Sequence, residues 1–226
     1  MKPWKTLGTD RLPDGQELAL QERDGVFVIR LDGRELMSSA RHGSEEALAR
    51  AGLADLRREA ATVLVGGLGL GYTLRAALDL LPAKASVVVA EISKAVVEWN
   101  RGPLAALAGA PLDDPRVKIE VAEIGKYLAK TRERFDAILT DVDNGPSADP
   151  NPTNDRLYTK AGLAAFRDAL RPGGMLVIWS AGPAEGFVKR LSQAGFRGDE
   201  RRVDARAGKE VKKGTQHMLF IGRRPF

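Results

Sequence analysis

The chain contains no cysteine and only two histidines among its 226 residues. Without cysteine it can form neither disulfides nor thiolate metal sites. The two histidines, His42 and His217, lie too far apart for the ligand spacing of a zinc site, so we expect no metal. No apolar run is long enough to span a membrane, and the N-terminal segment lacks the apolar core of a signal peptide. We therefore expect a cytoplasmic protein with no membrane partner.

Two common catalytic signatures are missing as well. No lysine follows the glycine-rich stretch at residues 66–71, which argues against the phosphate-binding loop of an ATPase. No Gly-x-Ser-x-Gly pattern occurs, which argues against a hydrolase with a nucleophile elbow. The 35 basic and 30 acidic residues give a net charge of +5 but are mostly interspersed. A mixed solvated surface is therefore favoured, and a nucleic-acid partner stays a possible but less favoured prediction.

The sequence does contain a glycine-rich stretch, TVLVGGLGLGYT at residues 62–73. An apolar, β-branched run enters it, and a helix-like segment at residues 74–81 follows directly. Strand, glycine turn and helix in this order are typical of a nucleotide-binding unit, although a plain strand-to-helix turn has the same appearance. Glycine lets the backbone approach a ligand closely because it has no Cβ. We predict that Gly67, Gly69 and Gly71 contact a nucleoside cofactor.

The first 55 residues have a different pattern from the rest. Short strand-like pieces at residues 17–21, 26–31 and 35–37 are separated by Asp-Gly pairs, which are hairpin-turn signals. We predict a small antiparallel β-meander here. A helix over residues 45–51 should follow it, with Ser44 as its N-cap.

From residue 56 to residue 226, apolar strands alternate with helices. The expected strands are residues 62–65, 86–90, 116–121, 135–140 and 175–179, then 196–203 and 216–222. Such alternation implies a parallel sheet covered on both faces, and the last pair, with no helix between its strands, suggests an antiparallel hairpin. We predict an α/β protein with a Rossmann-like, seven-stranded mixed sheet. Residues 56–226 would form its nucleoside-binding catalytic domain.

Polar side chains follow several of the predicted strands. Glu91 comes about twenty residues after the glycine turn, where a carboxylate can accept both hydroxyls of a ribose. Glu123 follows the third strand and could meet an adenine ring or serve as a helix N-terminal charge. Asp141, Asp143 and Asn144 follow the fourth strand, and their acidity suggests a cationic ligand or a base that deprotonates an amine. Ligands bind at this edge of an open α/β sheet, so we expect these residues to form one site.

Three further residues are less distinctive. Tyr158 begins a helix predicted over residues 157–170, and it either points into the site or packs in the core. His42 lies in the segment that enters the main domain and is a candidate substrate contact. His217 lies in the strand-like QHMLFIG, and we interpret it as structural.

The sequence resembles the spermidine synthase (polyamine aminopropyltransferase) family and, more broadly, class I AdoMet-dependent methyltransferases. The resemblance runs along most of the chain, from the β-rich N-terminal piece through the glycine turn, Glu91 and the acidic cluster to LRPGGMLVIW. It implies a class I methyltransferase fold and transfer of an aminopropyl group from decarboxylated AdoMet to an amine, with release of methylthioadenosine. It further implies that Asp141 helps to deprotonate the attacking amine. A homodimer is an additional expectation.

The chain also departs from the family pattern. The family glycine motif reads like GGGDGG, and Leu70 stands here in place of its aspartate. The family Tyr-His-Glu near the domain entrance becomes Ser44-Glu45-Glu46, so Glu46 is retained as a candidate substrate contact. The nucleoside half of the site therefore resembles the family more closely than the diamine half does.

Three functions remain open at this point. The first is an aminopropyltransferase-like enzyme that binds AdoMet or decarboxylated AdoMet, with Asp141 and Asp143 as the catalytic carboxylates. The second is an AdoMet-dependent methyltransferase acting on a small molecule or on RNA. RNA would be favoured if the basic residues of the last thirty positions gathered beside the site. The third is a non-catalytic nucleoside-binding module that lost activity together with the aspartate at position 70.

Overall fold

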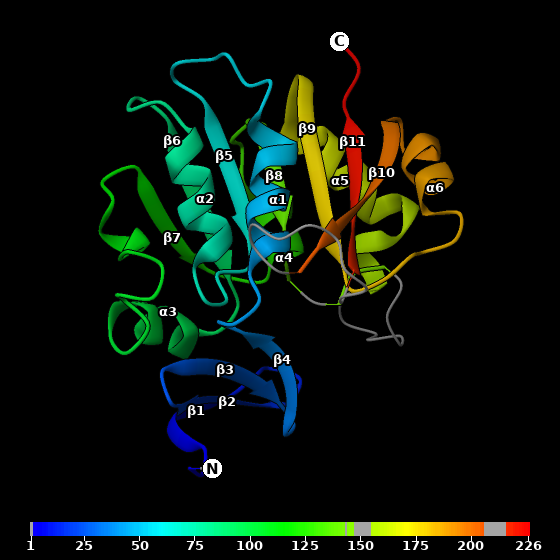
Figure 1. The fold of residues 1–226 in the computed structure, drawn as a ribbon. Coiled ribbons are helices and arrows are strands. Elements are labelled where there is room, and N and C mark those ends of the chain that lie inside the picture. Colours follow the sequence, from blue (N-terminus) through cyan, green and yellow to red (C-terminus); the bar gives the residue numbers. More distant parts are fainter. Residues whose placement is uncertain (1, 143, 147–154, 206–215) are drawn as a thin grey trace.

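The structure, a computed structural model, describes residues 2–142, 144–146, 155–205 and 216–226. It contains a small and a large β-sheet (Figure 1). The small sheet is antiparallel in the order β1-β2-β3-β4, with the strands Lys5–Arg11, Glu17–Arg23, Val26–Leu31 and Arg34–Ser38. The Asp24-Gly25 and Asp32-Gly33 turns have positive φ at both residues, as two-residue hairpin loops require. The predicted meander is confirmed, with β1 as an additional strand.

The large sheet has seven strands in the order β10-β11-β9-β8-β5-β6-β7. Their bounds are Thr62–Gly66 (β5), Ser86–Glu91 (β6), Val117–Val121 (β7), Phe135–Thr140 (β8), Leu170–Ser180 (β9), Arg197–Asp204 (β10) and Gln216–Arg223 (β11). The strands from β9 to β7 pair in parallel, whereas β11 runs antiparallel to both β9 and β10. The predicted seven-stranded mixed sheet with a terminal antiparallel hairpin is therefore confirmed.

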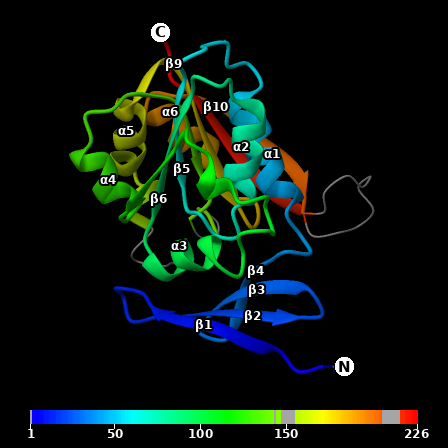
Figure 2. The same cartoon turned by 90° about the vertical axis from the view of Figure 1, so that its left-hand side faces the viewer.

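Helices cover both faces of the large sheet, as Figure 2 shows from the side. They are α1 (Gly43–Leu53), α2 (Tyr72–Leu80), α3 (Lys94–Arg101), α4 (Ile124–Lys130), α5 (Lys160–Ala169) and α6 (Phe187–Gln193), with short 3-10 turns at Pro111–Asp113 and Asp155–Tyr158. Alternation along β5 sends Val63 and Val65 into the core under α1, α2 and α3, and Leu64 into the core under α4, α5 and α6. Among the described helices, none is long and apolar enough to cross a membrane.

The small sheet lies beyond the carboxyl ends of the parallel strands (Figure 1). Leu20 and Ile29 from its strands belong to the same core cluster as the helices α1 and α2. A hydrogen bond of 2.6 Å from Ser93 Oγ to Asp10 Oδ2 ties α3 to β1. The small sheet is thus held over the sheet edge where ligands of open α/β folds bind.

Three local expectations differ from the structure. His42, not Ser44, occupies the N-cap position of α1, and Ser44 lies inside the first turn. The segment expected to be one helix from residue 157 is split by Thr159, whose Oγ1 accepts the Gly162 N–H at 3.1 Å and caps α5. The strand β9 already begins at Leu170, because Gly173 and Gly174 exchange backbone hydrogen bonds with Arg224 at the end of β11.

Candidate functional site

The glycine turn brings the backbone against two other segments. Gly67 has φ of 82°, and a Cβ there would collide with the Asp141 carbonyl oxygen. Gly69 has φ of 51°, and its Cβ would lie 2.9 Å from the Met37 sulfur on β4. Both positions therefore need glycine for conformation and for space. The turn lies between β8 and the small sheet, while Gly71 occupies the N-cap position of α2.

Glu91 holds the glycine turn in place from the end of β6. Its carboxylate is 7% exposed and accepts the backbone N–H of Leu68 at 2.8 Å and that of Ser93 at 2.9 Å. Burial raises the pKa of Glu91, and these backbone hydrogen bonds act in the opposite direction. The backbone N–H groups of Gly69 and Ile92 act on the carboxylate in the same direction.

A groove runs past the carboxyl ends of β6 and β7. Its volume is about 1230 Å³, and Ile92, Val121, Glu123 and Leu157 are among its lining residues. Ile92 and Val121 are large apolar side chains left 37% and 53% exposed. Glu123 caps α4 by accepting the N–H groups of Gly125 and Lys126. We call this the strand-end groove, and its apolar floor beside Glu91 suits a flat aromatic ring.

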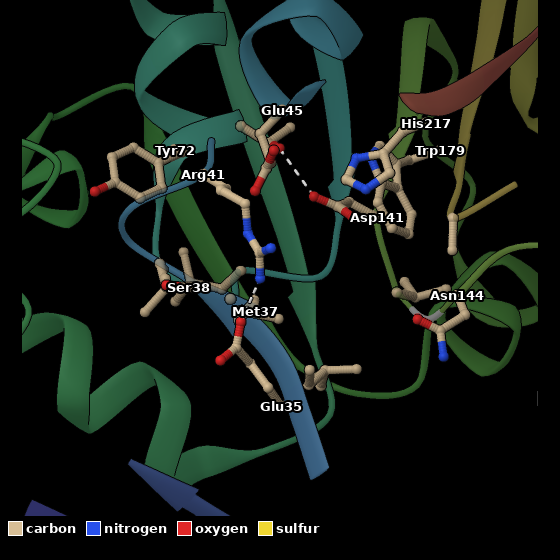
Figure 3. A pocket seen from close by; sticks show the side chains of 17 residues that line it. Glu35, Met37, Ser38, Arg41, Glu45, Tyr72, Asp141, Asn144, Trp179 and His217 are labelled. Atoms are coloured by element: carbon tan, nitrogen blue, oxygen red, sulfur yellow. Dashed lines mark hydrogen bonds and ion pairs between the residues drawn. The ribbon is translucent and has the colours of Figure 1, made fainter. Parts of the chain in front are cut away.

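A second cavity, of about 200 Å³, opens between the glycine turn, β4 and the N-terminus of α1 (Figure 3). We call it the carboxylate cavity. Its lining residues include Met37, Leu68, Gly69, Leu70, Tyr72, Thr73, Asp141, Asn144, Trp179 and His217, together with Glu35, Arg41 and Glu45. The predicted residues Asp141, Asn144 and Gly69 thus meet in one place.

Asp141 enters the carboxylate cavity from the end of β8. Its backbone N–H donates to the Gly66 carbonyl at 2.8 Å, which continues the pairing of β8 with β5 past the last strand residue. Its side-chain Oδ2 accepts the Thr73 hydroxyl at 3.2 Å from the first turn of α2. The carboxylate is therefore oriented by the same helix that the glycine turn begins.

Three polar side chains from distant segments connect at the opposite wall. His217 Nδ1 lies 2.9 Å from Ser44 Oγ, and Ser44 Oγ donates to Glu45 Oε2 at 2.6 Å. The His217 ring also stands edge-on to Trp179, with centroids 4.6 Å apart. Burial raises the pKa of Glu45 and lowers the pKa of His217, and Arg41 lowers the latter further. Both shifts make the neutral form of the group more favourable than it is for the same group in water.

The charge of the carboxylate cavity favours a cationic ligand. Arg41 is paired with Glu35 at 2.5 Å, so that pair carries no net charge. Asp141 and Glu45 are the other two acidic residues of the lining, and Figure 3 shows them near His217. Within the described part of the chain, no group of three potential metal ligands gathers. The cavity is thus suited to an ammonium or sulfonium group.

The remaining predicted contacts lie elsewhere. His42 pairs with Glu46 at 3.0 Å and stacks on Tyr72 with ring centroids 4.1 Å apart, and neither His42 nor Glu46 lines the cavity. Tyr158 is 5% exposed in the core and stands edge-on to Phe187. Asp143 lies outside the described residues. Substrate contacts by His42, Glu46 and Tyr158, and the catalytic role of Asp143, stay predictions.

Sequence reasoning missed the contribution of Glu45, Trp179 and His217. Glu45 adjoins the retained Glu46, but only the helical position of α1 shows which of the two faces the cavity. Trp179 is the next-to-last residue of β9, and the rule that strand ends carry sites could have singled it out. His217 is the second residue of the antiparallel strand β11 and had no comparable signal.

The chain matches a known family over much of its length. Residues 41–185 match the family model described as Spermine/spermidine synthase domain. The polyamine aminopropyltransferase of Korarchaeum cryptofilum is 30% identical over 137 residues, which are 61% of this chain and 40% of that relative. The chain thus matches less than half the length of this curated relative.

Solved structures show the same fold. The spermidine synthase from Thermotoga maritima aligns with a TM-score of 0.74 at 23% identity, covering 97% of this chain and 73% of that one. A spermidine synthase in complex with the transition-state analogue AdoDATO gives a TM-score of 0.73 at 22% identity, covering 97% and 72%. At these identities the likeness concerns the fold, and it confirms the predicted methyltransferase-like class.

Proposed function

Because the chain belongs to the spermine/spermidine synthase family, we propose that it is a transferase that moves an aminopropyl group from decarboxylated AdoMet to an amine. One observation carries this proposal. The acidic carboxylate cavity opens directly beside the glycine turn, so a sulfonium donor and an amine acceptor can meet there. The name of the Korarchaeum relative, a polyamine aminopropyltransferase, supports the same reaction.

The donor nucleoside would occupy the strand-end groove and the glycine turn. Its adenine would lie against Ile92 and Val121 with Glu123 at its edge, and its ribose hydroxyls would donate to Glu91. Gly67, Gly69 and Gly71 would let the thioether end pass close to the backbone toward Asp141. Glu91 directly precedes Ile92, which lines the strand-end groove, and this adjacency supports the order.

The reaction needs an amine with a free lone pair. An ammonium acceptor would first lose a proton, and its nitrogen would then attack the carbon next to the sulfonium. The carbon–sulfur bond breaks as the carbon–nitrogen bond forms, and the electron pair stays on sulfur as a neutral thioether. Asp141 would hold the acceptor by its charge, with Asn144 as a further polar contact. Positioning two reactants in line is the main catalytic task here.

The cavity also favours the decarboxylated donor over AdoMet. The carboxylate of AdoMet would enter a cavity that already holds Asp141 and Glu45, and like charges at short range repel. Decarboxylated AdoMet brings only cationic groups to the same place. We therefore propose that decarboxylated AdoMet is the donor.

Methyl transfer from AdoMet is the second candidate function, and one observation favours it. Leu70 is 4% exposed, lines the cavity and stands where the family pattern has an aspartate. An aminopropyl ammonium therefore lacks that partner. RNA gains no support as the acceptor, because none of the described basic residues from Arg197 onward lines the cavity. Lys209, Lys212 and Lys213 lie outside the described residues.

Product analysis separates the candidates. The protein would be incubated with decarboxylated AdoMet or with AdoMet, each with a panel of diamines and polyamines, and the products identified by mass spectrometry. Aminopropyl transfer yields methylthioadenosine and an acceptor enlarged by one aminopropyl unit. Methyl transfer yields S-adenosylhomocysteine and a methylated acceptor. Binding of methylthioadenosine without any turnover would instead favour a non-catalytic nucleoside-binding module.

A further inference from the structure

We propose that His217, held by Ser44 and Glu45, is the group that accepts the proton from the acceptor amine. The inference rests on the proposed aminopropyl transfer and assigns the proton step within it. Asp141 then serves as the charged anchor of the amine. Ser44 and Glu45 are positioning residues that act through His217.

The hydrogen-bond directions determine which nitrogen of His217 is free. The Ser44 hydroxyl has one proton, and it donates that proton to Glu45 Oε2 at 2.6 Å. The Ser44 oxygen therefore accepts from His217 Nδ1 at 2.9 Å, which places the ring proton on Nδ1. Nε2 keeps its lone pair, and the ring lines the carboxylate cavity together with Asp141 (Figure 3).

The surroundings keep His217 uncharged near neutral pH, so that its Nε2 lone pair is available. Burial lowers the pKa of its imidazole below 6.5, Arg41 lowers it further, and Asp204 on β10 acts in the opposite direction. The ring is thus uncharged when the substrate arrives. The uncharged Trp179 stands edge-on to the ring, and Asp141 and Glu45 line the same cavity.

The proton step balances within the proposed reaction. The acceptor ammonium loses one proton to Nε2, and its nitrogen lone pair forms the new bond to carbon. Sulfur keeps the electron pair of the broken bond and becomes neutral. The imidazolium then carries one positive charge, which Glu45 stabilises through Ser44, until the proton leaves to solvent. A base of this kind contributes roughly 10²- to 10⁴-fold to a rate.

Backbone hydrogen bonds fix both Ser44 and His217 in the fold. Ser44 is 1% exposed, and the backbone N–H of its neighbour Gly43 donates to the Ala205 carbonyl at 3.0 Å. The N-terminus of α1 is thereby fixed to the end of β10, which pairs with β11 at the level of His217 through Val203. Residues that are 173 positions apart are thus held in a constant relation.

The tautomer can be tested without turnover. The chain has two histidines, so a His42→Gln variant leaves His217 as the single imidazole in a ¹⁵N-labelled spectrum. We expect Nδ1 to carry the proton and Nε2 to show the shift of an unprotonated nitrogen. Ser44→Ala should lose this preference, and Ser44→Thr should keep it. A His217 ring protonated on Nε2 in the otherwise unchanged protein would overturn the proposal.

The catalytic role is tested by kinetics and chemical rescue. His217→Asn keeps an N–H for Ser44 but has nothing in the place of Nε2, and we expect kcat to fall on the order of 10²-fold or more. Donor affinity, measured by calorimetry, should change less than threefold. Added imidazole should restore part of the rate of His217→Gly in proportion to its neutral form, and should not stimulate the matched His42→Gly variant.

The two levels of inference fail in different ways. An unchanged protein that produces no aminopropyl product with any amine contradicts the proposed function. An active protein whose His217→Asn variant keeps its kcat contradicts only the role of His217. A lost rate that imidazole does not restore, while His217→Gly still binds the donor, also overturns this role.

Discussion

Asp141 is the residue at which charge and shape can be separated. Asp141→Asn keeps the size of the side chain, and its amide oxygen can still accept the Thr73 hydroxyl that now bonds at 3.2 Å. We expect turnover to fall on the order of 10²-fold, because the acceptor amine loses its charged anchor. Donor affinity should change far less. Steady-state kinetics and calorimetry on the same preparation measure both quantities, and near-normal turnover would contradict the role.

The control for Asp141→Asn is a substitution of Thr73, whose hydroxyl donates to the Asp141 carboxylate. Thr73→Val removes the hydroxyl that orients Asp141 but keeps the carboxylate charge. Its effect on turnover should be severalfold at most, since one neutral hydrogen bond contributes about 1 kcal/mol. If Thr73→Val and Asp141→Asn lose activity equally, orientation rather than charge is the function of Asp141.

Glu91 gives a prediction about stability and pH. Burial raises the pKa of Glu91 from 4.5 in the folded chain, so the folded state favours the neutral carboxyl. Its contribution to the free energy of unfolding is therefore full below pH 4.5 and is lost as the pH rises through the raised value. Urea unfolding of the unchanged chain and of Glu91→Gln between pH 4 and pH 7 measures this. As the pH rises, the free energy of unfolding of the unchanged chain should fall relative to that of Glu91→Gln.

A second variant at this position concerns binding. Glu91→Ala leaves the buried N–H groups of Leu68 and Ser93 without their acceptor, at about 1–3 kcal/mol for each group. The glycine turn should then loosen, and methylthioadenosine affinity should fall roughly 5- to 100-fold, which corresponds to 1–3 kcal/mol. Unchanged affinity in a titration would show that the ribose has another partner.

At the scale of single elements, the junction of α3 with β1 holds the small sheet in place. Ser93 Oγ accepts the Val96 N–H at 3.1 Å as the N-cap of α3 and donates to Asp10 at 2.6 Å. Ser93→Ala should cost about 1–2 kcal/mol of unfolding free energy through the cap alone. Asp10→Ala should cost less, because it removes only the bond between the two parts. A double-mutant cycle with urea unfolding measures the coupling free energy between Ser93 and Asp10. A coupling of zero would contradict the proposed connection between α3 and β1.

The elements also show what the sequence could predict. Continuous apolar runs that end in glycine or an acidic residue identified β5, β6 and β8 almost to the residue, because these strands are buried on both faces. The edge strand β1 (Lys5–Arg11) has no buried residue and therefore no apolar signal. Asp141 and Glu91 were found because strand ends of a parallel sheet converge at one edge.

The acceptor side of the site was less accessible to such reasoning. Ser44 has the sequence signature of an N-cap, yet its hydroxyl bonds to Glu45 and His217 instead. Local rules concern residues a few positions apart, whereas this contact joins α1 to β11 across most of the chain. The sequence around His217 consequently showed only the pattern of a core strand, which gives no sign of this contact.

At the scale of the whole molecule, the site lies where the two sheets meet. Met37 from the small sheet contacts the glycine turn of the large one, and both line the carboxylate cavity. A donor bound there would contact both parts only in the folded chain. Ligand binding should therefore stabilise the whole molecule rather than one domain, and a single cooperative unfolding transition should shift as a unit.

This leads to a thermal prediction that distinguishes nucleosides by charge. Methylthioadenosine at one hundred times its Kd should add about 2.7 kcal/mol to the free energy of unfolding, or roughly 5–10 °C for a chain of this size. Adenosine monophosphate should give a smaller shift at equal concentration, because its phosphate would approach the carboxylates of Asp141 and Glu45. In Asp141→Asn the difference between the two ligands should narrow, while the shift with methylthioadenosine persists. Equal shifts from both ligands in the unchanged chain would show that the 5′ end of the nucleoside does not point into the carboxylate cavity.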